Sequence, residues 1–236
     1  MIYPLGIIFG ILPSFIWLMF YLKKDALPEP KKMVLKIFLF GMVSAFFALF
    51  CQIILILIGK KIYIPFPLFL FLNAGLIEEF SKFLPIKFFV LKNKELDEPV
   101  DIPLYMIISA LGFATVENIF LLINTQIEKI FMLTFFRFLT ATFLHALLSA
   151  ILGYFLVLSF LKLKSRGKIF LIGLICVSFL HWLYDLIIIK IGLFYRQNLL
   201  FEALLYFALM FLMLAVLGII VSVFIKKIKK LKSICL

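Results

Sequence analysis

The chain has 236 residues, of which 66% are hydrophobic and only 15% charged, and its formal net charge is +12. A mean hydropathy of +1.23 excludes an ordinary water-soluble globular protein and is typical of a chain that crosses a membrane several times. The positive charge lies at the ends of apolar runs, as charge at a membrane surface does, so we do not expect a nucleic-acid-binding protein.

The apolar runs predict the fold, because about 20 helical residues are needed to cross about 30 Å of hydrocarbon. In chain order the runs cover residues 2–22, 33–59, 64–91, 102–124, 130–161, 168–190 and 199–225. The third run contains Pro85, where we expect a kink. Polar stretches between the runs are too short for a separate soluble domain. The sequence therefore predicts an all-α, polytopic membrane helix bundle of about seven transmembrane helices, with residues 1–236 as a single membrane-embedded domain.

The basic residues that flank the runs predict the orientation, because Lys and Arg resist translocation across the membrane. Most of them follow the first, third, fifth and seventh runs, among them Lys23, Lys31, Lys92, Lys94, Lys162, Lys164, Arg166, Lys226 and Lys232. We therefore expect a multi-pass protein of the cell membrane whose N-terminus is outside. Its C-terminus is then cytoplasmic, and residues 226–236 form a basic tail there.

Ionisable side chains also occur inside the apolar runs, namely Glu78, Glu79, Glu117, His145, His181 and Asp185. A charged group at the centre of a membrane costs roughly 2.5 to 3.5 kcal/mol on insertion scales, so such groups are functional candidates by default. At about 1.5 Å of rise per residue, Glu79, Glu117, His145 and His181 lie at similar depths in different runs. Side chains that merely reach for the membrane surface would lie near the ends of the runs instead. We therefore predict one common site in the bundle interior.

Spacing suggests individual roles for these groups. Glu78 and Lys82 are four residues apart and share a helix face, so the lysine can neutralise this carboxylate, while Glu79 points about 100° away. We expect Glu78 to be tied to Lys82 and Glu79 to be the better candidate for a general base, with exchanged roles as the alternative. His181 and Asp185 are also four apart, so Asp185 can orient the imidazole.

Each group has an ordinary explanation as well. A single membrane histidine usually makes an interhelical hydrogen bond, and a carboxylate–lysine pair such as Glu78 with Lys82 can serve packing alone. Asp185 could simply accept a hydrogen bond from the imidazole of His181. The agreement in depth of several acids and both histidines favours a functional site over these separate explanations.

The polar groups also form short motifs along the chain. These are Glu78-Glu79 with Lys82, the segment GFATVEN at residues 112–118 that ends in Glu117 and Asn118, His145, and His181 followed by Asp185. In order and spacing they resemble the motifs of the PrsW family of intramembrane proteases. The segments DALPEP at residues 25–30 and DEPVD at residues 97–101 resemble that family as well, and the resemblance extends from about residue 13 to residue 189.

The resemblance implies a membrane-embedded peptidase that acts on a membrane-anchored protein. It also implies a distant relationship to the CAAX prenyl endopeptidase and bacteriocin-immunity superfamily. The paired glutamates Glu78 and Glu79 and the histidines His145 and His181 are then the expected catalytic residues, while Lys82 and Asn118 give structural support. The family is grouped with the metallopeptidases.

Metal-assisted and metal-free mechanisms both remain open. In the first, His145, His181 and a carboxylate, either Glu117 or one of the glutamate pair, hold a zinc ion, and a glutamate of the pair takes the proton from its bound water. In the second, a glutamate of the pair and His145 activate water directly, while His181 and Asp185 steady the oxyanion. The presence of both histidines beside spare carboxylates slightly favours the metal.

Other classes of protein can use the same residues. A proton- or cation-coupled transporter also carries buried Glu, Asp and His, although the sequence has no clear internal repeat. A non-catalytic immunity or assembly protein could keep the fold and lose the chemistry. We place the protease first, the transporter second and the non-catalytic protein third. The sequence does not predict an oligomeric state.

Overall fold

The computed structural model describes residues 2–25, 27–93, 96, 98–161 and 165–231. Several residues used above lie outside these ranges. They are Ala26 and Asp97 of the flanking motifs, the basic residues Lys94, Lys162, Lys164 and Lys232, and residues 232–236 of the expected tail.

The described part of the chain is helical and contains no strand, which confirms the all-α class. The α-helices are α1 (Ile2–Lys23), α2 (Lys31–Gly59), α3 (Phe66–Leu70), α4 (Ile77–Pro85), α5 (Asp101–Ile123), α6 (Ile127–Leu139), α7 (Ala141–Leu161), α8 (Arg166–Arg196) and α9 (Leu200–Ile228). The π-helical segments are η1 (Phe71–Leu76) and η2 (Ile86–Val90).

In the described residues, 6 helical stretches are long and apolar enough to cross a membrane. They correspond to α1, α2, α5, the α6–α7 pair, α8 and α9. The remaining predicted run is helical over residues 66–90, but it is divided into α3, η1, α4 and η2. The multi-pass helix bundle of about seven spans is therefore confirmed.

The divided run carries the glutamate pair in its middle. π-Helical turns are rare and occur mostly as single-turn insertions, frequently at functional sites, and here they lie on both sides of α4. Pro85, where a kink was expected, is the last residue of α4, and η2 follows it directly. Proline has no backbone N–H and so cannot donate the hydrogen bond that a regular helix makes at this position.

The run at residues 130–161 is interrupted as well, where α6 meets α7. Thr140 has a φ of −119° and a ψ of −89°, which are not helical values. Trp17 of α1 packs against this break: its indole N–H donates to the Phe138 carbonyl at 2.9 Å, and its ring stacks on Phe143 at 4.5 Å. The interruption separates α6 from α7, and α6 contacts both α1 and α5.

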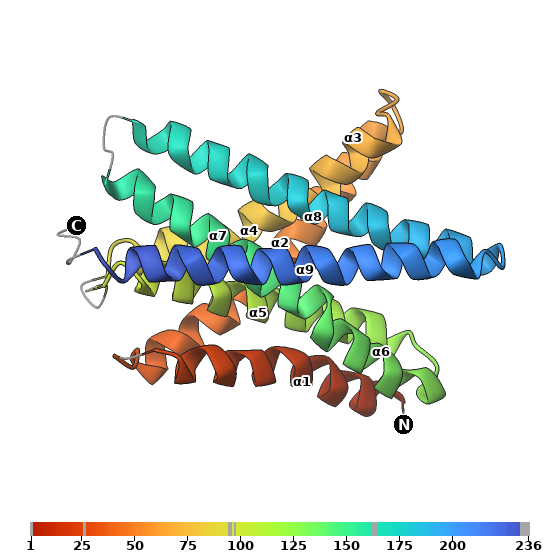
Figure 1. Ribbon diagram of the computed structural model, residues 1–236, viewed down its shortest axis with the longest axis horizontal. Helices are drawn as coiled ribbons and strands as arrows, with labels where there is room; N and C mark the ends of the chain where they lie inside the picture. Colours follow the sequence, from red (N-terminus) through yellow and green to blue (C-terminus); the bar gives the residue numbers. More distant parts are fainter. Residues whose placement is uncertain (1, 26, 94–95, 97, 162–164, 232–236) are drawn as a thin grey trace.

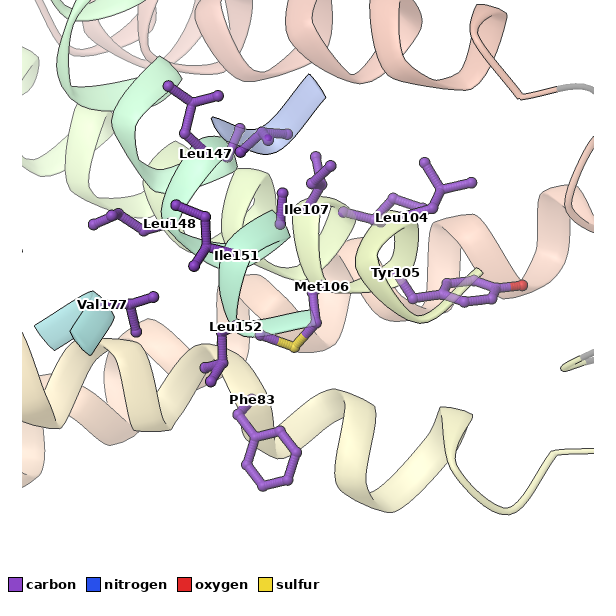
Figure 2. Close-up of a cluster of buried hydrophobic side chains, with 14 of the residues drawn as sticks. Phe83, Leu104, Tyr105, Met106, Ile107, Leu147, Leu148, Ile151, Leu152 and Val177 are labelled. Carbon is purple, nitrogen blue, oxygen red and sulfur yellow. The ribbon is translucent and has the colours of Figure 1, made fainter. Parts of the chain in front are cut away.

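The core of the bundle is built on α5 and α7. α5 packs against α1, α2 and α7, while α7 packs against α8, and α8 against α9. Figure 2 shows this core, where Met106 of α5 and Leu152 of α7 meet beside Phe83 of α4. By contrast, α1, α2 and α9 keep much of their apolar surface exposed, as expected of helices that face lipid.

Close contacts between helices depend on small residues. A Cβ at Gly112 of α5 would lie 2.1 Å from the carbonyl oxygen of Phe38 in α2, and one at Gly75 of η1 would lie 2.4 Å from that of Ser178 in α8. Both distances are far below a van der Waals contact, so these positions accept only glycine without movement of the backbone. The contacts bring α5 and the glutamate-bearing segment against their neighbours.

The ends of the described chain lie on opposite sides of the bundle. Figure 1 shows α1 beginning at the end opposite to that where α9 finishes, with α9 running along the length of the bundle. An odd number of crossings requires this arrangement. Which end faces the cytoplasm stays a prediction from the basic residues.

Candidate functional site

A cavity of about 570 Å³ reaches into the bundle between α4, α5, α6, α7 and α8. Its polar lining consists of Glu78, Glu117, Arg137, Thr140, His145, His181, Tyr184 and Asp185. The rest is apolar and includes Leu133 and Phe136 of α6, Leu144 of α7 and Ile188 of α8. The polar residues form the floor of the cavity and the apolar residues form its walls. This combination is typical of a site that binds an apolar chain and acts on a polar group within it.

The expected site residues meet at this floor. His181 Nδ1 lies 2.8 Å from Glu79 Oε1, and His145 Nε2 lies 2.8 Å from Glu117 Oε2. The rings of His145 and His181 pack edge to face, with centroids 5.2 Å apart and an interplanar angle of 76°. Asp185 lies within 4.0 Å of His181 Nε2, one helical turn away on α8. Residues from four separate predicted runs therefore form one cluster.

The two glutamates have different surroundings. Glu79 is fully buried, and its Oε1 accepts hydrogen bonds from Lys82 Nζ at 2.7 Å and from His181 Nδ1. Glu78 lines the cavity, and its Oε1 accepts from Gln52 Nε2 at 3.1 Å. Among the described residues, Glu78 Oε2 has no hydrogen-bond partner although it is buried. Glu79 Oε2 is also buried without a partner among these residues, but Glu78 lines the cavity and Glu79 does not.

The expected ion pair of Glu78 with Lys82 is present, but Lys82 lies closer to Glu79. The Lys82 ammonium is 3.8 Å from Glu78 Oε2 but 2.7 Å from Glu79 Oε1. On a helix the i,i+3 and i,i+4 neighbours are about equally close, so spacing alone does not choose between the carboxylates. Lys82 turns into the protein interior, where Glu79 and His145 lie, while Gln52 binds Glu78 from the other side.

Arg137 ties α6 to the site. Its Nη2 lies 3.3 Å from Glu117 Oε2, the same oxygen that contacts His145, and its Nε donates to Asn118 Oδ1. Asn118 Nδ2 in turn donates to Thr142 Oγ1 at 3.1 Å. Asn118 therefore links α5 to α6 and α7, and its supporting role stays a prediction.

The hydrogen bonds indicate the proton positions on the histidines. An ammonium group is only a donor, so His145 Nδ1, at 2.7 Å from Lys82 Nζ, accepts, and its Nε2–H donates to Glu117. His181 Nδ1–H donates to Glu79, which leaves the Nε2 side facing Glu78 Oε2 at 3.8 Å and Asp185. The two imidazoles thus have opposite tautomers when both are neutral.

A possible metal-binding group is present among the described residues. Glu78, His145 and His181 each offer a ligand atom, and these atoms lie within 4.8 Å of one another. Glu78 with its free Oε2 and His181 with its carboxylate-bound Nδ1 fit such a role. His145 fits it poorly while Lys82 occupies its Nδ1. Glu117, a ligand expected from the sequence, is instead hydrogen-bonded to His145 and Arg137.

Arg137 and Gln52 are further polar residues of the site that the sequence did not single out. Arg137 is a charge inside an apolar run and meets the same criterion that selected the acids. Gln52 is a lone amide in α2 that bridges the Asn73 carbonyl and Glu78, each at 3.1 Å. Polar residues inside apolar runs are the common signal for both.

Comparisons with known proteins give matches over most of the chain. A model of the PrsW family, described as intramembrane metalloproteases, matches residues 29–224. Protease PrsW of Geobacillus kaustophilus is 36% identical over 166 residues, which is 70% of this chain and 71% of that protein. Protease PrsW of Bacillus subtilis is 34% identical over 173 residues, 72% of this chain and 75% of that protein. No solved structure matches the chain significantly.

Proposed function

Because this chain belongs to the PrsW family of intramembrane proteases, we propose that it hydrolyses a peptide bond of a membrane-anchored protein through water activated by Glu78. The observation that carries the proposal is the free, buried Oε2 of Glu78 at the floor of the cavity, opposite His181. Family membership favours a protease over the transporter and the non-catalytic protein. Glu78 takes the place of Glu79 as our candidate for the base.

Peptide hydrolysis needs a base for water, donors for the oxyanion and an acid for the leaving amine. Glu78 Oε2 accepts the proton of the attacking water and afterwards returns it to the amine. Arg137 and a protonated His181 line the cavity and can donate to the oxyanion. Glu79, Lys82 and Asp185 would keep His181 in position, while Glu117 does so for His145.

A metal-assisted form of this reaction uses the same floor. Glu78, His145 and His181 would hold the ion once Lys82 no longer donates its hydrogen bond to His145. Zinc suits a set of two histidines and a carboxylate. Such an ion, when bound, polarises the carbonyl and acidifies a water.

The surroundings of the cavity suggest how the substrate is bound. Leu133, Phe136, Leu144 and Ile188 would contact apolar side chains next to the cleaved bond. We further propose that the protein resides in the cell membrane, with its N-terminus outside and its basic C-terminal end in the cytoplasm, because the basic residues are concentrated on one side. The substrate would then be a protein anchored in that membrane.

The test is cleavage of membrane-anchored reporter peptides by the purified full chain in detergent. Glu78→Gln keeps the size of the side chain and removes the base, so the rate should fall by roughly 10²–10⁴-fold. Glu128→Gln, at an exposed position of α6, is the matched control and should cleave like wild type. Equal cleavage by wild type and Glu78→Gln would remove Glu78 from the mechanism.

A further inference from the structure

The ammonium of Lys82 lies in surroundings that resemble a cation-binding site. It is fully buried and lies 2.7 Å from Glu79 Oε1, 2.7 Å from His145 Nδ1 and 3.8 Å from Glu78 Oε2. The ring of Phe113 covers it at 4.7 Å from the centroid. Carboxylate, imidazole and aromatic groups from α4, α5 and α7 thus converge on this one charge.

The ammonium controls what His145 can bind. Because Lys82 donates to Nδ1, the imidazole proton is on Nε2 and is donated to Glu117 Oε2 at 2.8 Å. Neither nitrogen of His145 then offers a lone pair to a metal ion. A divalent ion beside His145 would also be repelled by the ammonium, and such repulsion is strong in a buried site.

His181 shows the opposite arrangement within the same cluster. Its Nδ1–H donates to a carboxylate, Glu79 Oε1, at 2.8 Å, as is usual for a metal-ligating histidine. Its Nε2 faces the free Oε2 of Glu78 at 3.8 Å. One half of the cluster is therefore arranged for a metal, and the half around His145 is arranged for the lysine.

We propose that Lys82 is the resident cation of this site and that its ammonium and a divalent metal ion bind in competition. His145 becomes available as a metal ligand only when the ammonium is removed or displaced. With Lys82 in place, His145 is restricted to hydrogen bonding with Glu117. The inference rests on the site of the proposed function, but it concerns ion binding and does not require that peptide cleavage be observed.

The test is a zinc titration of the purified, chelator-treated full chain by calorimetry or by competition with a fluorescent zinc indicator. Lys82→Met removes the charge at similar length, so it should bind zinc at least about tenfold more tightly than wild type. Lys82→Arg keeps the charge and should bind zinc as weakly as wild type. In the double variant Lys82→Met/His181→Ala the gain should disappear, which assigns the zinc to this cluster.

The proposal is overturned if Lys82→Met binds zinc no more tightly than wild type. Metal analysis of wild type purified without chelator gives a second test, which does not depend on the folding of a variant. We expect substoichiometric zinc that His181→Ala leaves unchanged. Stoichiometric zinc that His181→Ala removes would also overturn the proposal, since metal and ammonium would then coexist. Because no cleavage is measured, either result is distinct from a failure of the protease assay.

Discussion

Lys82 Nζ donates a hydrogen bond of 2.7 Å to Oε1 of Glu79, and both side chains are fully buried. The same oxygen accepts from His181 Nδ1, so Glu79 links a lysine of its own helix to a histidine of α8. Glu78, one residue earlier, is left to face the cavity. The adjacent glutamates therefore differ: Glu79 is bonded to Lys82 and His181, and Glu78 lines the cavity.

The first prediction concerns Glu79 as a structural carboxylate. Glu79→Gln leaves the buried Lys82 ammonium without its nearest counter-charge, and breaking a buried ion pair costs about 3–5 kcal/mol. We expect a clear fall in the melting temperature of the purified protein in detergent. Glu78→Gln should lower it much less, because Glu78 is 3.8 Å from the ammonium. Equal melting temperatures for wild type and Glu79→Gln would contradict the assigned role.

The second prediction concerns Arg137 as a positioning residue. Arg137→Gln loses the contact with Glu117 and so loosens the oxygen that holds His145, which should lower kcat by about 10–100-fold. Arg137→Lys keeps the charge but cannot bind Glu117 and Asn118 together, so it should restore only part of the rate. Separate measurement of kcat and KM on a reporter peptide checks this expectation.

The control for Arg137 lies on the same helix. Lys129→Gln removes an exposed positive charge of α6 and should leave both kinetic constants unchanged. A loss at Arg137 that appears only in KM would indicate substrate binding instead of positioning.

The contacts between the polar groups could be predicted because the rise per helical residue gives the depth of each side chain in the membrane. Glu79, Glu117, His145 and His181 were placed at one level from the ends of their runs, and the contacts between them follow from that level. Periodicity does not distinguish a partner at i+3 from one at i+4, so the sequence predicted the ion pair of Lys82 with Glu78 but not its shorter contact with Glu79.

Other features depend on contacts between distant segments. The break at Thr140 has no glycine or proline to mark it, and Trp17, more than a hundred residues away, donates to the carbonyl of Phe138 in the last turn before it. The π-helical turns beside α4 leave no periodic signal in an apolar run either. The approach of Arg137 to Glu117 follows from that break and was therefore not predictable from the sequence.

The third prediction concerns the contact of α5 with α2. Gly112→Ala would place a Cβ 2.1 Å from the Phe38 carbonyl oxygen, so the helices must separate, at a cost of about 1–3 kcal/mol or more. The shift also moves Glu117, so both the melting temperature and peptide cleavage should fall. Gly218→Ala in α9 is the matched control, because a Cβ there has no described atom within 4 Å. Similar losses in both variants would indicate that the close approach is unimportant.

The last prediction concerns pH and the loop before α2. Burial of Glu29, together with the nearby charges of Asp101 and Asp25, raises the pKa of its carboxyl from 4.5 to about 8, and a hydrogen bond from Tyr105 offsets part of this effect. Between these values the folded protein binds more protons than the unfolded chain. The contribution of Glu29 to the stability of the folded protein should therefore be greatest below about pH 4.5. It should be lost as the pH rises to about 8.

Glu29→Gln removes this titration and should flatten the dependence, so that the variant melts at a higher temperature than wild type above about pH 8. Melting temperatures measured across this range in one detergent check the expectation. Glu128→Gln, at an exposed position of α6, should keep the wild-type slope. A Glu29→Gln variant whose melting temperature follows that of wild type at every pH would show that this carboxyl does not set the pH dependence of stability.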